Sequence, residues 1–438
     1  MILLKKLNID HRQMSKRISP ILVVLAGICL MVAALLWLTN QIFMVPPCML
    51  AAMVCLAFGF RGYDSLKAFS YTIWILITVC LGMFYPQYFK SVGNFELKKL
   101  IIPFVQLTMF GMGAHMSLND FKGVIKMPKG VLIGVCCHFL IMPLVGFMLS
   151  HLFRFPPEIS GGIVLIGCVS SAMASNVMSY LSGGNLALAV TIGACSTMIS
   201  PLITPLLMKI LAGQFIQVDM SHMMIDIANM IFIPIIAGFI FNLFYFVNTK
   251  QRDRNFQLGW FAMLIVLINV LISFINGITF FGYWKLLFES FFWFYVLPMI
   301  VAILLRKGKV PYSKVDVILS FVAMLGILIN TVIMTSSGRD NLLQVGGLLI
   351  ITCFLHNIMG LGVGYFVSKL FGLPEKDRRT IAFEVGMQNG GVAAGLATQM
   401  GKVASIGLAA LVFGPLQNVT GSILANWFKN RPAEVKGN

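Results

Sequence analysis

An uncharged stretch near the amino terminus limits what this chain can fold into. It runs from Ile18 to Phe60, 43 residues without Asp, Glu, Lys or Arg. As a helix it would be about 64 Å long, roughly twice the thickness of the hydrocarbon core of a bilayer. The stretch must therefore cross a membrane twice, with a turn between Thr39 and Pro47. A cleaved signal peptide is the alternative, but no small-x-small cleavage site follows the apolar core.

The rest of the chain has the same character. Hydrophobic residues make up 58% of the 438 residues and charged residues 11%, against about 45–50% and 25% in soluble domains. A bilayer offers the backbone no water, so only helices or closed barrels can span it. Barrel strands alternate polar and apolar residues, and the long apolar runs exclude them. The sequence predicts an all-α polytopic membrane protein.

The same length argument, applied along the chain, predicts fourteen membrane-spanning helices. We expect them at about 18–39, 42–60, 68–89, 97–118, 130–153, 160–181, 185–212, 223–247, 257–281, 284–305, 314–336, 341–370, 379–400 and 403–428.

The basic residues indicate the orientation. Of the 32 Lys and Arg, 24 fall on the side of the amino terminus and 8 on the other side, which predicts that both termini are cytoplasmic. The net charge of +17 is spread over many short loops, so the expected partner is the lipid bilayer and no nucleic acid. The nine Cys have no CxxC spacing, and the common hydrolase, metalloprotease and phosphate-loop motifs are absent.

One acidic residue stands out because charged groups inside a membrane are costly and are usually functional. Glu384 begins the polar sequence Glu384 to Gly391, and a helix would put Gln388 on the same face as Glu384. The glycines of this segment weaken a helix by about 1 kcal/mol each relative to Ala. We expect the helix to unwind here. The alternative is that Glu384 reaches toward Arg378 and Arg379.

A second polar interruption lies in the sixth predicted span, from Ser170 to Asn176. Ordinary helix packing in lipid is an alternative interpretation for Ser170 and Ser171, but it does not explain Asn176. The two interruptions fall in the sixth and thirteenth spans, at corresponding places in two halves of the chain. Paired interrupted helices of this kind indicate the midplane site of a secondary transporter.

Two histidines repeat this spacing, His138 in the fifth span and His356, beside Asn357, in the twelfth. A single His within a helix is more often a packing residue, although either side chain could titrate near neutrality.

Several stretches resemble the bile acid:sodium symporter (BASS/SBF) family over about residues 70–428. They are MFGMG (Met109 to Gly113), IMP (Ile141 to Pro143), the run from Gly162 to Pro205 containing ASNVMSYL, HN (His356, Asn357) and RTIAFEVGMQNGG (Arg379 to Gly391). The resemblance implies a core of about ten helices in two inverted repeats with two crossed discontinuous helices. About four helices would be additions.

The expected organisation follows from this resemblance. Residues 1–67 would be a cytoplasmic tail with two extra transmembrane helices, and 68–247 would hold the first repeat and the start of the second. Residues 248–313 would be an inserted helical hairpin, 314–430 the remainder of the second repeat, and 431–438 a cytoplasmic tail.

The resemblance also implies site residues. The cation-binding set would be Ser175, Asn176, Glu384, Val385, Met387, Gln388 and His138, and the substrate-binding set Asn389, Asn176, His356 and Asn357.

Some positions depart from the family pattern. Ala189 and Gly193 stand where the family has hydroxyl residues, and His138 stands where it has Gln. Pro-Gly-Gly is replaced by Ser171-Ala172-Met173. Thr191 would face elsewhere, about 200° round the helix. Because sodium prefers hard oxygen ligands, we expect altered sodium dependence, with His138 and Glu384 as a proton-binding pair.

The predicted function is secondary active symport that takes up an organic anion across a bacterial inner membrane by alternating access, coupled to sodium or a proton and without another cofactor. The resemblance suggests a carboxylate such as pantothenate, a keto acid or a sterol acid. One alternative is a proton-coupled or facilitative carrier of a small carboxylate. An intramembrane enzyme using His138 or His356 is the alternative from a different class.

Overall fold

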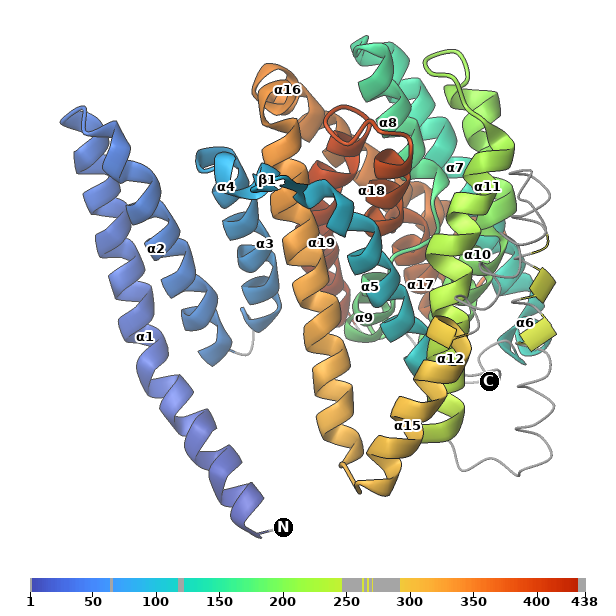
Figure 1. The fold of residues 1–438 in the computed structure, drawn as a ribbon, viewed down its shortest axis with the longest axis horizontal. Coiled ribbons are helices and arrows are strands. Elements are labelled where there is room, and N and C mark those ends of the chain that lie inside the picture. The colour runs from blue at the N-terminus through green and yellow to red at the C-terminus, as the bar shows by residue number, and fades with distance from the viewer. Residues whose placement is uncertain are drawn as a thin grey trace.

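The computed structural model describes residues 2–63, 66–116, 122–245 and 292–431, with short stretches at 262–263, 266–267 and 270. In these ranges the regular structure is helical except for one short hairpin, in which β1 (Ser91–Val92) pairs antiparallel with β2 (Phe95–Glu96) (Figure 1). Within the described residues, seven helices are long and apolar enough to cross a membrane. The predicted all-α membrane protein is confirmed.

The amino-terminal half contains α1 (Ile2–Leu38), η1 (Ile42–Met44), α2 (Val45–Gly59), η2 (Phe60–Gly62), α3 (Lys67–Phe84), α4 (Gln87–Lys90), η3 (Leu97–Leu100), α5 (Ile101–His115), α6 (Lys122–Lys126), α7 (Pro128–Phe153), α8 (Pro157–Cys168), α9 (Met173–Leu181), α10 (Leu186–Leu207) and η4 (Met208–Ala212). After it come α11 (Met220–Ile227), η5 (Ala228–Phe232), α12 (Ile233–Tyr245), η6 (Phe292–Val296), α15 (Leu297–Lys307), α16 (Tyr312–Leu370), α17 (Glu375–Gly386), α18 (Gly390–Gln399) and α19 (Gly407–Lys429).

The first two helices form a hairpin at the side of the molecule (Figure 1). α1 packs along α2, and α2 packs on α3, where the Ser70 hydroxyl donates to the Ala57 carbonyl at 2.7 Å. The turn lies where the sequence predicts it, with Asn40 in the left-handed region at φ 60°. The uncharged stretch therefore folds as two antiparallel helices.

Glycines bring α5 and α12 into close contact. A Cβ atom on Gly113 would lie 2.3 Å from the Ile235 carbonyl oxygen, and one on Gly238 would lie 2.3 Å from that of Phe110. Small residues allow helix backbones to approach in this way inside a membrane. Gly113 of the MFGMG sequence thus serves helix packing.

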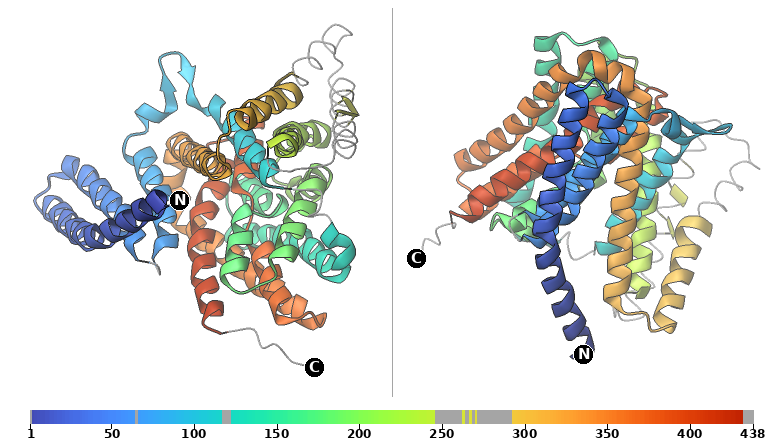
Figure 2. Two further views of the ribbon diagram at one scale, coloured as in Figure 1. Left: turned by 90° about the horizontal axis from the view of Figure 1, so that it is seen from below. Right: turned by 90° about the vertical axis from the view of Figure 1, so that its left-hand side faces the viewer.

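α16 differs from the prediction. The sequence predicts two spans separated by a loop at 337–340, but the helix continues through all 59 residues from Tyr312 to Leu370. A straight helix of that length would measure about 88 Å, and Figures 1 and 2 show instead that α16 turns over at one end of the molecule.

The polar residues at this turn bind other elements, which is why they do not end the helix. Ser336 donates to the Phe89 carbonyl at 3.1 Å and Arg339 to that of Met83 at 2.8 Å. Asn341 donates to the carbonyl of Ala404 at 2.8 Å.

The predicted spans at 257–281 and 284–305 lie largely outside the described residues. α15 covers the end of the second and packs on α12.

Candidate functional site: the crossing of two broken helices

Both predicted interruptions are real. The first broken helix consists of α8 and α9, joined by extended residues after Cys168, and the second consists of α17 and α18, joined at Met387 to Asn389. The four halves have 9 to 12 residues each, whereas about 20 are needed to span a bilayer. Each pair can therefore cross the membrane only together.

The two extended segments pair with each other. Ser171 and Gln388 form an antiparallel β-bridge, in which the Ala172 amide donates to the Met387 carbonyl at 3.1 Å and the Asn389 amide to the Ser170 carbonyl at 2.9 Å. Backbone groups freed from a helix in lipid must find partners within the protein. The crossing supplies them.

Side chains from neighbouring helices bind the remaining freed groups. Gln417 of α19 accepts from the Gln388 amide at 2.7 Å and donates to the Gln388 carbonyl at 2.9 Å. Asn357 of α16 donates to the carbonyl of Gly386 at 2.9 Å, and Thr204 of α10 donates to that of Cys168 at 2.7 Å. Sequence reasoning missed Gln417, although an amide in the middle of an apolar span is a usable signal.

Glu384 lies at this crossing and is fully buried. Ser175 donates to its Oε1 atom at 2.5 Å and Ser171 to its Oε2 atom at 2.8 Å. Among the described residues, no Lys, Arg or His side chain is within ion-pair distance of this carboxylate. The carboxylate is therefore bound by hydroxyl groups alone.

Two amide oxygens at the crossing have no hydrogen-bond partner in the part of the chain that the structure describes. They are Asn176 Oδ1 and Gln388 Oε1, and both atoms are buried. The Gln388 orientation is fixed, because its Nε2 atom donates to the Val385 carbonyl at 2.8 Å. An unpaired buried oxygen is costly, and such atoms are suitable ligands for a hard cation. The residues present thus fit a bound cation beside Glu384.

The backbone carbonyls of Val385 and Met387 each accept one hydrogen bond, from Gln388 Nε2 and from the Ala172 amide. A carbonyl oxygen has two lone pairs, so each retains capacity for a cation.

His138 contacts the main chain of Glu384 and does not contact its carboxylate. The imidazole Nδ1 atom lies 2.9 Å from the Glu384 carbonyl oxygen, and Nε2 lies 2.8 Å from that of Val169. Both oxygens belong to the ends of half-helices, α17 and α8. The imidazole therefore links the two broken helices.

A cavity of about 220 Å³ lies between the crossing and the helices α3, α5 and α16. Its wall includes Asn389 but not Asn176, His356 or Asn357. Asn389 caps α18, accepting from the Val392 amide at 3.2 Å, and the first residues of α18, Gly390 and Gly391, also line the cavity. The positive end of the α18 helix dipole thus faces this space.

His356 and Asn357 are fully buried and do not line the cavity. His356 Nε2 lies 2.8 Å from the Met142 carbonyl oxygen and its ring packs against Phe413. Asn357 binds Gly386 and accepts from the Thr420 hydroxyl. Their contacts hold helices together around the site.

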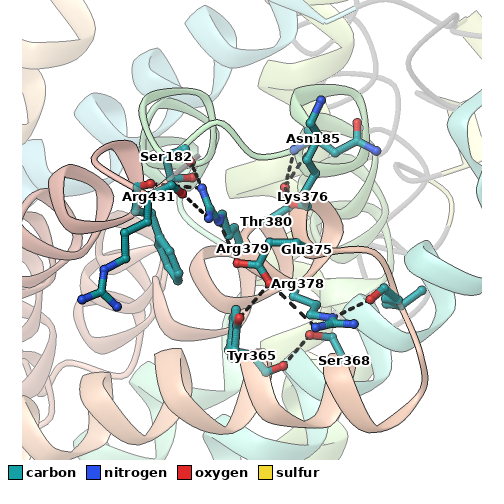
Figure 3. Close-up of polar contacts among 12 residues, drawn as sticks. Ser182, Asn185, Tyr365, Ser368, Glu375, Lys376, Arg378, Arg379, Thr380 and Arg431 are labelled. Atoms are coloured by element: carbon teal, nitrogen blue, oxygen red, sulfur yellow. Dashed lines mark hydrogen bonds and ion pairs between the residues drawn. The ribbon is translucent and has the colours of Figure 1, made fainter. Parts of the chain in front are cut away.

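A second polar cluster lies at the start of α17 (Figure 3). Arg379 pairs with Glu375 at 2.9 Å and donates to the carbonyls of Ser182, Phe428 and Arg431. Arg378 also faces Glu375, at 3.8 Å. Both arginines therefore pair with Glu375. The alternative interpretation, in which Glu384 reaches toward them, is wrong.

Comparisons of the sequence with known proteins find similar transporters. Residues 102–283 match the family described as "Sodium Bile acid symporter family". The chain is 29% identical to the "Uncharacterized sodium-dependent transporter YocS" of Bacillus subtilis (strain 168), over 83% of this chain and 91% of the relative.

Two further relatives come from a plant and an animal. The "Probable sodium/metabolite cotransporter BASS1, chloroplastic" of Arabidopsis thaliana is 27% identical over 84% of this chain and 75% of its own length. The "Ileal sodium/bile acid cotransporter" of Homo sapiens is 25% identical over 71% of this chain and 73% of its own length. The family and these relatives are transporters and not enzymes. The chain is therefore similar to transporters of the sodium bile acid symporter family.

Proposed function

We propose that this chain is a cation-coupled symporter that takes up a small organic anion by alternating access. The observation that carries the proposal is the crossing of two broken helices at a buried carboxylate, Glu384, together with the unpaired side-chain oxygens of Asn176 on α9 and of Gln388 between α17 and α18. A cation bound there would neutralise the carboxylate and satisfy these oxygens at once. Sodium is the first candidate because the names of the relatives include it.

The lining of the cavity favours an anionic substrate. Its wall includes the amino-terminal end of α18 and side chains that can donate hydrogen bonds, among them Asn389, Asn330 and Asn418. A helix amino terminus with its amide groups favours an anion. A carboxylate at Asn389 would lie close to the bound cation, and this proximity would couple the binding of the two solutes.

The size of the cavity favours a small substrate. Pockets for drug-sized ligands measure about 300–1,000 Å³, and this one measures about 220 Å³. A short carboxylate such as a keto acid or pantothenate fits this space better than a sterol acid.

Ala189 and Gly193 stand where the family pattern has hydroxyl residues, and this supports weakened or altered sodium dependence. A Cβ atom on Gly193 would lie 3.7 Å from Glu384 Oε2, so a side chain there would point at the carboxylate. Thr191 does not replace it: its hydroxyl donates to the Ala187 carbonyl and faces Gly123. A proton-coupled or facilitative carrier is the second candidate, favoured by the absence of side-chain oxygens at Ala189 and Gly193.

The proposed arrangement in the membrane is the one expected from the sequence. It comprises about fourteen spans, of which ten form the core, with both termini in the cytoplasm of a bacterial cell and the chain in the inner membrane. Residues 1–67 and 248–313 would be additions to that core.

Transport into proteoliposomes tests the function. Organic acids are first screened by thermal shift of the purified protein, each with sodium chloride and with choline chloride. Uptake of the best ligand should then be driven by an inward sodium gradient and should show counterflow of unchanged substrate. Equal uptake in choline buffer would contradict sodium coupling, and an imposed proton gradient would then identify the second candidate.

A further inference from the structure

Ser171 places a hydroxyl group in the site at a position where the family pattern has none. Ser171 lies in the extended segment between α8 and α9, where the family pattern has no hydroxyl, and its side chain is 2% exposed. Its Oγ atom lies 2.8 Å from Glu384 Oε2 and 3.3 Å from Ser175 Oγ. The two serine hydroxyls and the carboxylate therefore all contact one another.

This position is held by the fold. The Ser171 backbone is bridged to Gln388, and its amide donates to the Ser196 hydroxyl of α10 at 3.4 Å. The backbone of Ser171 is thus fixed by neighbouring elements, in a position from which its hydroxyl reaches the carboxylate.

We propose that Ser171 is a ligand of the coupling cation and replaces the oxygen atoms lost at Ala189 and Gly193. The site would then consist of both Glu384 oxygens, the hydroxyls of Ser171 and Ser175, and the unpaired Asn176 oxygen. On cation binding, Ser171 keeps its proton and turns a lone pair toward the ion. The inference rests on the proposed function, because it assumes a cation beside Glu384.

Ser170 provides a matched control. It is the neighbouring residue, its side chain is fully buried, and its Oγ atom has no hydrogen-bond partner in the described part of the chain. Removing either hydroxyl deletes the same atom from the same segment, but only Ser171 contacts Glu384.

The test is binding of radioactive sodium to the purified full-length protein, measured for Ser171→Ala, Ser170→Ala and Glu384→Gln. We expect Ser171→Ala to weaken sodium binding roughly tenfold or more, the range for a lost residue at a metal site, and Ser170→Ala to stay within about twofold of the unchanged protein. Ser171→Thr retains the hydroxyl on an extended backbone that suits a β-branched residue and should restore most of the binding.

The outcomes separate the two proposals. If Glu384→Gln binds sodium as tightly as the unchanged protein, the proposed function loses its cation site. If Glu384→Gln loses sodium binding while Ser171→Ala and Ser170→Ala bind equally well, only the role of Ser171 is overturned. A Ser171→Thr protein that is monodisperse and as weak as Ser171→Ala also overturns it.

Discussion

Two glutamates on α17 lie nine residues apart and have opposite surroundings. Glu375 is partly exposed and pairs with Arg379 and Arg378, and the Tyr365 hydroxyl donates to it at 2.8 Å. Glu384 is fully buried and is bound by two serine hydroxyls. Among the described residues, the protein thus supplies a counter-charge to the carboxylate at the start of α17 and none to the carboxylate at the crossing. We propose that the first stabilises the fold and that the second binds the coupling cation.

The largest effect is expected for Glu384→Gln. The amide has nearly the shape of the carboxylate but lacks its charge, so the site loses its strongest attraction for a cation. We expect cation-dependent uptake to be abolished and sodium affinity to fall by about a hundredfold, measured by transport and binding. Glu375→Gln is the control and should retain the sodium response. A loss in both variants would remove the distinction between the two glutamates.

Arg379 should be the main stabilising residue of the second cluster. Its side chain is 5% exposed, and it binds three carbonyls and packs over the Phe428 ring at 4.7 Å. Arg379→Met leaves these carbonyls without this donor, whereas Glu375 keeps Tyr365 and Arg378. An unpaired buried group costs about 1–3 kcal/mol, so we expect a loss of about 3 kcal/mol. Thermal unfolding in detergent measures the loss.

Arg378→Met serves as the comparison for that measurement. Arg378 is more exposed and lies farther from Glu375, so its removal should cost about 1 kcal/mol or less. Equal losses for Arg378 and Arg379 would contradict the assignment of Arg379 as the anchor.

Substrate binding and cation binding at the crossing can be tested separately. Asn389→Ala removes a cavity-lining amide and the cap of α18, and loss of such a cap costs about 1 kcal/mol. We expect roughly tenfold weaker substrate binding with unchanged sodium affinity, measured by thermal shift with each solute. Asn418→Ala, at another place on the same cavity, should have less effect. If sodium affinity falls as much as substrate affinity, Asn389 belongs to the cation site.

The smallest effect is expected for Gly193→Ser, which adds an oxygen near Glu384 Oε2. One hydrogen bond or ligand of this kind contributes about 0.5–1.5 kcal/mol, so sodium binding should tighten by roughly threefold to tenfold. Gly347→Ser is the control, because a Cβ atom there meets open space. Unchanged or weaker binding in Gly193→Ser would show that the lost hydroxyls do not limit the site.

Much of the site could be predicted from the sequence, for a physical reason. Glycines and amides inside apolar spans disagree with helix formation in lipid, and this disagreement predicted interruptions at 170–176 and 384–391. The structure has the breaks at 169–172 and 387–389. Ser171 was not identified, because serine in a membrane helix is usually a packing residue, and only the crossing brings it to Glu384. The loop predicted near Gly338 is wrong because its polar residues bind other elements.

The position of a bound monovalent cation is the most direct test of the comparison between Glu384 and Glu375. Thallium(I) scatters strongly and substitutes for smaller monovalent cations, so crystals grown with it would reveal the site in an anomalous difference map. The account predicts a peak in contact with the Glu384 carboxylate and the hydroxyls of Ser171 and Ser175. A map with no peak at Glu384, or with its strongest peak at Glu375, would contradict it.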